Sequence, residues 1–170
     1  MIDDDNIMLA VPAADSFEYN VELNLYSSTS KKNEYGYIGL YKNKAISAVG
    51  KVIKVVKLEK QNDKINFDVP ITEDEENRIK RLEFEKCRGA SDPNYEFVPD
   101  KGRVVFFVDK FYKINYENVG KMGIMGSKKF FLDNLLPATT EEIAYQLDGQ
   151  TWKLEKGKKN IPSRKIDDIF

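Results

Sequence analysis

The sequence contains no histidine and a single cysteine, Cys87. Histidine is the commonest general base at neutral pH and the commonest metal ligand, so its absence removes the usual apparatus of acid–base and metal catalysis. One cysteine allows neither an internal disulfide nor a thiolate cluster for zinc. Because no histidine is present to activate it, Cys87 is expected to be a small core residue rather than a nucleophile. Neither a cofactor nor a metal is predicted.

Long apolar runs are also missing from the chain. No uninterrupted segment approaches the ~20 apolar residues that a membrane-spanning helix requires. Residues 1–5 are acidic where a signal peptide would be basic. We therefore expect a cytoplasmic protein that does not associate with membranes. Its 170 residues, 41% of them apolar, suffice for one globular domain with a substantial core.

The net charge of −1 conceals alternating blocks of charge. Residues 1–30 carry six acids and no base, residues 31–64 carry nine lysines and three acids, and residues 65–100 are again acidic. Residues 101–131 form a second basic block. Both basic blocks have strand-like patterns, so together they would give a sheet one basic face, on which a polyanion docks. The alternative interpretation is that these lysines are the solvated side of amphipathic strands, where lysine also protects edges.

The segment from Tyr35 to Lys60 predicts two strands joined by a tight turn at Asn43 and Lys44. Aromatic and β-branched residues fill both arms. Lysines recur every three residues in the second arm, which strict alternation cannot keep on one face, so a bulge is expected at Gly50. A short strand followed by a long bent one is typical of a strongly curved sheet or small barrel.

Other segments predict helices and further strands around this hairpin. Three expected helix starts share a capping residue with an acid three positions later: Asp15 with Glu18, Thr72 with Glu75, and Thr139 with Glu142. These helices should end near Asn24, Gly89 and Gly149. Strands are expected over residues 6–11, 65–69, 103–114 and 130–133, and loops over 25–33 and 90–102. The predicted fold class is α+β, mostly β, with two or three flanking helices.

The segment Gly120–Lys129 holds three glycines and three lysines. Glycine-rich backbone presents N–H groups to an anion, and the lysines add positive charge, so the segment predicts a phosphate contact. It has neither the Gly-Lys-Ser/Thr ending of a P-loop nor a dinucleotide fingerprint. A flexible surface turn is the alternative interpretation.

The order of elements, with Asn24–Thr29 before the hairpin and Ala48–Val52 in its second strand, resembles the PUA-like superfamily and most closely its YTH and EVE branches. The resemblance covers about residues 6–58. It implies a PUA-like curved sheet or small barrel and, as in YTH domains, an aromatic cage for a methylated adenine. Tyr26 stands where YTH domains have a tryptophan, and the second cage tryptophan has no clear counterpart.

Tyr26, with Ser27 and Ser28 beside it, is the expected floor of a base-binding pocket, followed by Tyr37 and Tyr41. A flipped base gains ~1–3 kcal/mol by stacking on an aromatic ring, while hydroxyl groups and backbone read its edge. For each tyrosine the alternative is a core ring whose hydroxyl reaches the surface. The lysines expected to contact phosphates, without reading sequence, are Lys31, Lys32, Lys42, Lys44, Lys128 and Lys129.

Nothing in the sequence indicates catalysis. No lysine has an acid two residues before it, as a typical metal-dependent nuclease motif requires, and the paired acids lie in predicted helices. We therefore expect a non-catalytic domain that binds DNA or RNA, with a pocket for a modified base, as in a bacterial or archaeal defence or restriction system. The alternative is a protein-interaction or specificity module of a larger assembly that uses acidic patches such as residues 3–5 and 73–76.

The expected domain organisation is simple. Residues 1–150 should form one PUA-like domain, and residues 151–170, charged and rich in lysine, a tail or a linker to a further domain or subunit. Trp152 is expected to anchor the start of this tail on the core.

Overall fold

The structure is a computed structural model that describes residues 4–29, 34–62, 64–89, 102–124 and 126–153, without the side chains of residues 83–89. It is mostly β, so the predicted α+β class is confirmed. Its elements in chain order are η1 Asp4–Asn6, β1 Ile7–Pro12, α1 Phe17–Leu23, β2 Leu25–Ser28, β3 Tyr37–Lys42, β4 Ala45–Gln61, β5 Lys64–Phe67, α2 Glu73–Gly89, β6 Arg103–Val108, β7 Tyr112–Asn118, β8 Lys128–Phe131, η2 Asp133–Leu135, α3 Thr140–Leu147 and β9 Thr151–Trp152.

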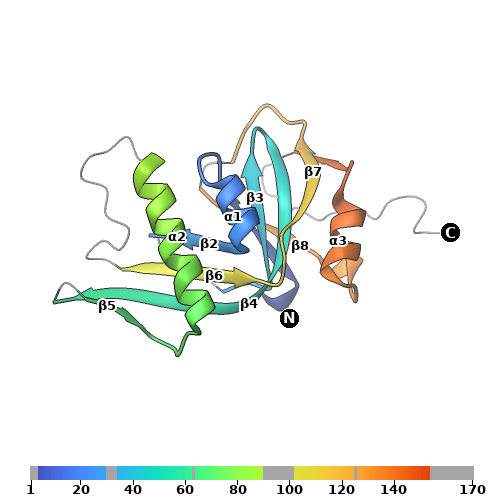
Figure 1. Cartoon of the computed structure of the whole chain (residues 1–170). Coiled ribbons are helices and arrows are strands. Elements are labelled where there is room, and N and C mark those ends of the chain that lie inside the picture. Colours follow the sequence, from blue (N-terminus) through green and yellow to red (C-terminus); the bar gives the residue numbers. More distant parts are fainter. Residues whose placement is uncertain (1–3, 30–33, 63, 90–101, 125, 154–170) are drawn as a thin grey trace.

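The long strand β4 is the spine of one mixed, open sheet (Figure 1). The first half of β4 pairs with β3 on one edge and β7 on the other, and its second half pairs with β5 and β6. Beyond these, β1 lies parallel to β3 and pairs with β8, β2 pairs with β6, and β9 lies parallel to β7. The two basic blocks of the sequence are therefore neighbours in the sheet.

Bulges bend β4, but not at the predicted residue. The register of β4 shifts between Ile46 and Ala48 against β7, and between Val52 and Lys54 against β6. Gly50 pairs in register with Ile38, so the prediction of a bulge there is wrong. The glycine is needed for a different reason, because a Cβ at Gly50 would lie 2.8 Å from Cγ2 of Val108, closer than van der Waals contact allows.

The core consists of three clusters of buried apolar side chains. Helices α2 and α3 lie towards opposite ends of the molecule (Figure 1). One cluster packs α2 on the second half of β4 with β2 and β6, through Leu25, Val56, Leu58, Ile79, Leu82, Val105 and Phe107. The middle cluster fills the space between the two halves of the bent sheet, through Leu9, Val11, Phe17, Tyr26, Ile38, Leu40 and Phe106. The last packs α3 and β9 on the first half, through Met8, Tyr37, Val49, Phe130, Ile143, Leu147 and Trp152.

Two of the three predicted helix N-caps, the predicted end of α1 and the docking of Trp152 are confirmed. Thr72 and Glu75 form the reciprocal capping box of α2, at 2.9 and 3.1 Å, and the Thr139 hydroxyl accepts from the Glu142 N–H at 3.2 Å. Helix α1 ends at Asn24, which adopts the left-handed conformation. Trp152 is buried and donates from Nε1 to the carbonyl of Tyr116 at 2.9 Å, so it anchors the chain on the core as predicted.

Three local predictions are wrong. Helix α1 has Ser16 rather than Asp15 at its N-cap, and the Ser16 hydroxyl donates to the Asn20 side chain instead of capping the backbone. Residues 25–28, expected to be loop, form β2, because their backbone pairs with β6 and their side chains are buried. The expected strand over 103–114 is two strands, β6 and β7, which meet at a corner over residues 109–111.

Some predictions fall outside the described residues. These are most of the loop over 90–102, residues 154–170 of the tail, and the side chain of Cys87, whose backbone lies in α2. Within the described part of the chain, no helix has the length and apolar character needed to span a membrane.

Candidate nucleic-acid interface

The turn between β3 and β4 lies against the start of the glycine-rich segment (Figure 1). Asn43 and Lys44 both have positive φ, 52° and 62°, as a tight two-residue hairpin turn requires. The carbonyl of Lys44 accepts from the N–H of Asn118 at 2.7 Å, and its Nζ donates to the carbonyl of Gly120 at 3.0 Å. Two segments more than 70 residues apart in sequence are thereby joined.

The buried side chain of Asn118 holds this junction from within. Its Nδ2 donates to the carbonyl of Met122 at 2.8 Å, and its Oδ1 accepts from the N–H of Gly120 at 2.9 Å. Because one amide side chain bonds the loop at both ends of a short span, residues 118–122 are held in a defined arc. The start of the glycine-rich segment is therefore tied to the hairpin turn by hydrogen bonds.

Several cationic and apolar side chains at this junction are exposed. Lys44 and Lys121 are exposed and make no ion pair with any described residue, and Lys42 is half-buried. Val119 and Met122 are 58% and 60% exposed, which is unusual for large apolar side chains. We call these five residues the hairpin-tip surface: Lys42, Lys44, Val119, Lys121 and Met122. One acid, Glu117, lies opposite Ala45 in the ladder and offsets part of the positive charge.

Lys42 and a neighbouring lysine, Lys113, both lie over the ring of Phe17 in α1. The Nζ atoms of Lys42 and Lys113 lie 5.2 and 6.0 Å from the ring centroid, which places both ammonium groups in cation–π range. Lys113 also lies 3.6 Å from the carboxylate of Glu18. These lysines are thus held near one another by α1, although Glu18 compensates part of their charge.

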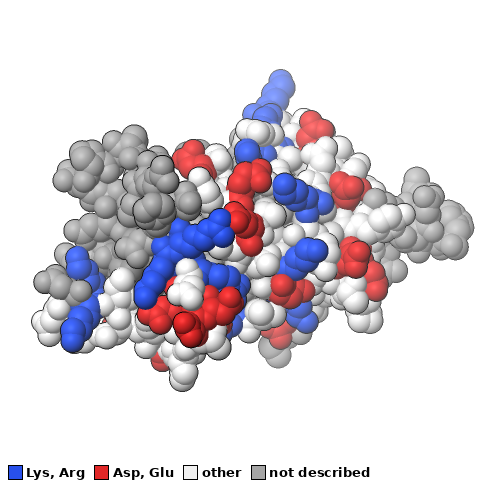
Figure 2. All heavy atoms as spheres, viewed as in Figure 1, with Lys and Arg blue, Asp and Glu red and all other residues white. Residues whose placement is uncertain are grey.

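The sheet as a whole does not present one basic face. Lys54 of β4 forms an ion pair with Glu75 of α2 at 2.9 Å, so the acidic start of α2 neutralises it. Figure 2 shows Lys and Arg side chains intermixed with Asp and Glu over the visible face. The continuous basic face predicted from the sequence blocks is therefore not seen on the face that Figure 2 shows, where acids interrupt it.

Tyr26, the expected floor of a base pocket, lies in the middle core cluster. It is only 6% exposed, and burial raises its pKa to about 12 although the charge of Arg103 opposes this. Ser28 shares the face of Tyr26, whereas Ser27 faces α2, where its hydroxyl accepts from Nη1 of Arg103 at 2.9 Å. A base stacks on Tyr26 only if the side chains that cover the ring move.

Tyr37 and Tyr41 lie on the opposite side of the sheet from Tyr26. Tyr37 is 4% exposed and its pKa is raised by burial and by the charges of Asp109 and Asp5. Tyr41 is half-buried, with its ring centroid 6.1 Å from that of Trp152. A Cβ built on Gly123 would lie 3.6 Å from the Tyr41 hydroxyl, so this tyrosine adjoins the glycine-rich segment. Tyr26 and these two tyrosines are not brought together into one cage.

The remaining predicted phosphate contacts are dispersed. Lys128 and Lys129 are consecutive in β8 and so point to opposite faces of the sheet. A hydrogen bond with Tyr35 raises the pKa of Lys129, whose Nζ lies 5.3 Å from the Tyr35 ring centroid. Lys31 and Lys32 lie outside the described residues. Lys121 belongs to the glycine-rich segment that was expected to contact phosphate, whereas Val119 and Met122 were not expected at a binding surface, because exposure of an apolar side chain has no signature in the sequence.

No group suited to metal catalysis is found in the described part of the chain, where no three acidic or cysteine side chains come close enough to hold a cation. Ser27 and Ser28 are buried hydroxyls rather than accessible nucleophiles. Compared with known proteins, the chain matches no family model, no curated protein and no solved structure.

Proposed function

We propose that this chain is a non-catalytic domain that binds nucleic acid through the hairpin-tip surface. The observation that carries the proposal is the hydrogen-bonded junction of Lys44 with Asn118 and Gly120, which brings lysines of both basic blocks beside two exposed apolar side chains. The resemblance to PUA-like domains, which are expected to be readers of this kind, supports the same class of function.

The two kinds of side chain have different roles in this proposal. Lys42, Lys44 and Lys121 contact phosphates and supply salt-dependent affinity without sequence information. Met122 and Val119 pack on the faces of unstacked bases, since a flexible thioether and a branched alkyl group fit any base. Tyr41, which adjoins Gly123, is the nearest of the predicted base-binding tyrosines to this surface. Because Tyr26 is buried, recognition of a modified base at that ring requires an opening of the core.

The second candidate function is a protein-interaction module. Three of the four acids in the first turn of α2 make contacts within the domain, and Glu73 is exposed. Glu75 pairs with Lys54 and caps the helix, Asp74 lies 3.0 Å from Arg78, and Glu76 lies 3.3 Å from Lys80.

Fluorescence anisotropy with labelled oligonucleotides tests the proposal. Single- and double-stranded DNA and RNA, with and without adenine or cytosine methylation, are titrated with the full chain at 50 and 200 mM salt. We expect the double variant Lys44→Gln, Lys121→Gln to bind roughly tenfold more weakly. The slope of log affinity against log salt concentration should fall by the equivalent of about two phosphate contacts. The control double variant Lys57→Gln, Lys64→Gln removes the same amount of charge from the second half of β4 and from β5. It should change neither the affinity nor the salt slope.

Two results contradict the proposal. One is the absence of binding to every oligonucleotide at low salt. The other is an equal loss of affinity in the two double variants, which would indicate a diffuse electrostatic attraction rather than a site at the hairpin tip.

A further inference from the structure

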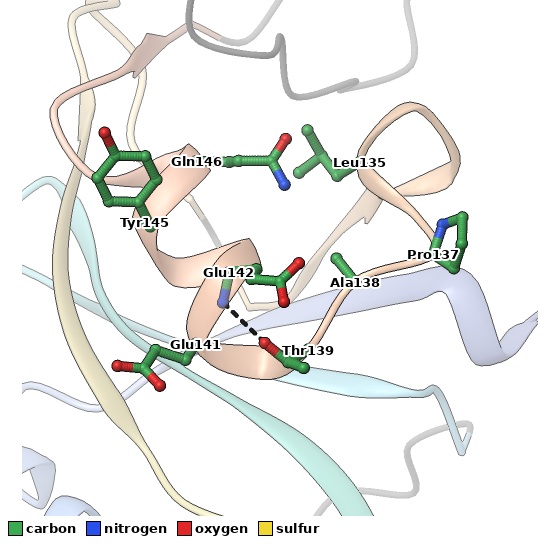
Figure 3. A pocket seen from close by; sticks show the side chains of 8 residues that line it. All are labelled: Leu135, Pro137, Ala138, Thr139, Glu141, Glu142, Tyr145 and Gln146. Atoms are coloured by element: carbon green, nitrogen blue, oxygen red, sulfur yellow. Dashed lines mark hydrogen bonds between the residues drawn. The ribbon is translucent and has the colours of Figure 1, made fainter. Parts of the chain in front are cut away.

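A hollow of about 670 Å³ lies between the first two turns of α3 and the segment that leads into it (Figure 3). Pro137 and Ala138 form an apolar wall, with the buried side chain of Leu135 beside them. The volume lies within the range of ligand-binding pockets, and the hollow is open to solvent on one side. It lies beside α3, whereas the hairpin-tip surface is built from the β3–β4 turn and the loop after β7.

Acidic and polar side chains of α3 border this hollow. Glu142 and Gln146, one helical turn apart, extend from α3 over the hollow towards the segment of Leu135 and Ala138 (Figure 3). Glu141 and Tyr145, also one turn apart, form the outer flank, and Tyr145 is 59% exposed. No described base lies within ion-pair distance of either glutamate, in contrast to the acids of α2.

The electrostatics of the rim favour a cation over an anion. The start of a helix carries about half a positive charge, whereas two ionised carboxylates carry a charge of about −2. The N–H of Glu142, which would otherwise bind an anion, already donates to the Thr139 hydroxyl at 3.2 Å. Acids in a first helical turn do stabilise the helix by themselves, but this role does not require an exposed tyrosine or a hollow beside them.

We propose that this hollow binds an arginine- or lysine-bearing peptide segment of a partner protein. The cationic head of one such side chain pairs with the carboxylate of Glu142 and donates to the amide oxygen of Gln146, while its methylene stem packs on Pro137 and Ala138. This site is independent of nucleic-acid binding, so one proposal can be wrong while the other is right.

Chemical-shift mapping of the full chain tests this assignment. The ¹⁵N-labelled protein is titrated with an acetylated octapeptide of alternating arginine and glycine, with its lysine counterpart, and with a glutamine counterpart as the neutral control. We expect amide shifts confined to the hollow and α3 with both cationic peptides and none with the neutral one. Arginine should bind more tightly than lysine if Glu142 and Gln146 are engaged together, because its guanidinium has several donors in one plane.

Variants that each remove one negative charge distinguish binding at this hollow from a general attraction of the peptide to acidic surfaces. Glu142→Gln preserves the capped backbone N–H and should weaken peptide binding about fivefold. Glu59→Gln removes one exposed acid from β4 and should leave binding unchanged. Shifts spread over all acidic surfaces, equal losses in Glu142→Gln and Glu59→Gln, or no shifts with any peptide at millimolar concentration would each overturn the proposal.

Discussion

The carboxylate of Asp109 accepts a hydrogen bond from the hydroxyl of Thr140, with 2.7 Å between Oδ2 and Oγ1. Its other oxygen accepts from the backbone N–H groups of Lys51 and Lys110, at 2.9 and 2.7 Å. One side chain therefore joins the middle of β4, the corner between β6 and β7, and the first turn of α3. This corner makes two strands of what the sequence predicted to be one, and it orients α3 on the sheet.

The link between Asp109 and Thr140 should be measurable as stability. Thr140→Val keeps the shape of the buried side chain but removes the hydrogen bond, so we expect a loss of about 1 kcal/mol in the free energy of unfolding. Urea denaturation followed by circular dichroism measures this loss. Thr151→Val, at an exposed position of β9, should stay within about 0.5 kcal/mol of the wild type. Equal losses in both variants would indicate that the Asp109 contact contributes nothing specific.

Because of Glu75, the free energy of unfolding should depend on pH in the acid range. Burial raises the pKa of Glu75, but its bonds to Lys54 and Thr72 outweigh burial and lower the pKa below its ordinary value of 4.5. The folded state therefore gains stability from ionised Glu75 above this value and loses it as the pH falls through the lowered pKa. We expect Glu75→Gln to cost about 1–2 kcal/mol at pH 7, a difference that disappears in strong acid.

Denaturation of wild type and Glu75→Gln across pH 2–7 gives this difference directly. Glu73→Gln is the matched control, because Glu73 lies in the same helical turn and is exposed. A Glu75 effect that stays constant across the range would show that shape, rather than charge, accounts for the loss.

Two buried tyrosines predict alkaline instability. Burial raises the pKa values of both Tyr26 and Tyr116 to about 12. The unfolded chain ionises these groups near pH 10, so stability is complete below that pH and falls as the pH rises towards 12. We expect a loss of roughly 1–3 kcal/mol per tyrosine over this interval and a smaller loss in Tyr26→Phe. Ultraviolet titration of tyrosinate that shows Tyr26 ionising at its ordinary value would contradict its burial and would favour an accessible cage.

Trp152 gives a direct test of how the chain after α3 docks. Its ring centroid lies 5.1 Å from that of Phe130 in an edge-to-face contact. As the sole tryptophan, it should emit at short wavelength in the native protein and shift to the red on unfolding. We expect Trp152→Ala to cost about 3–5 kcal/mol and Trp152→Phe, which loses the bond to Tyr116 but keeps most apolar contacts, clearly less. Red-shifted emission of the native protein would contradict the packing of β9.

The features that could be predicted from the sequence are those that depend on residues close to one another in the chain. The caps at Thr72 and Thr139 and the turn at Asn43 each depend on bonds within a few residues, and all three were predicted. β2 was mistaken for a loop because its hydroxyl-rich composition is typical of loops. It is a strand only because β6, some 80 residues later, pairs with it.

The candidate site shows the same division. The hairpin lysines and the glycine-rich segment were each predicted to contact phosphate, but their junction depends on the buried Asn118, whose contacts have no signature in the sequence. Tyr26 was the first candidate because of its place in the resemblance, but both faces of β2 are buried, so its ring lies in a core. Consecutive lysines in β8 diverge because side chains alternate along a strand.

If Met122 packs on bases, its contribution to binding can be measured separately from that of the lysines that contact phosphates. Met122→Ala removes apolar surface without changing charge, so we expect affinity for single-stranded oligonucleotides to fall about fivefold while the salt slope stays the same. Lys121→Gln should lower both quantities. Ile53→Ala is the matched control, since Ile53 is 63% exposed but lies in the middle of β4. If Met122→Ala binds like Ile53→Ala while Lys121→Gln is impaired, the hairpin tip contacts phosphates only, and the exposure of Met122 must serve another partner.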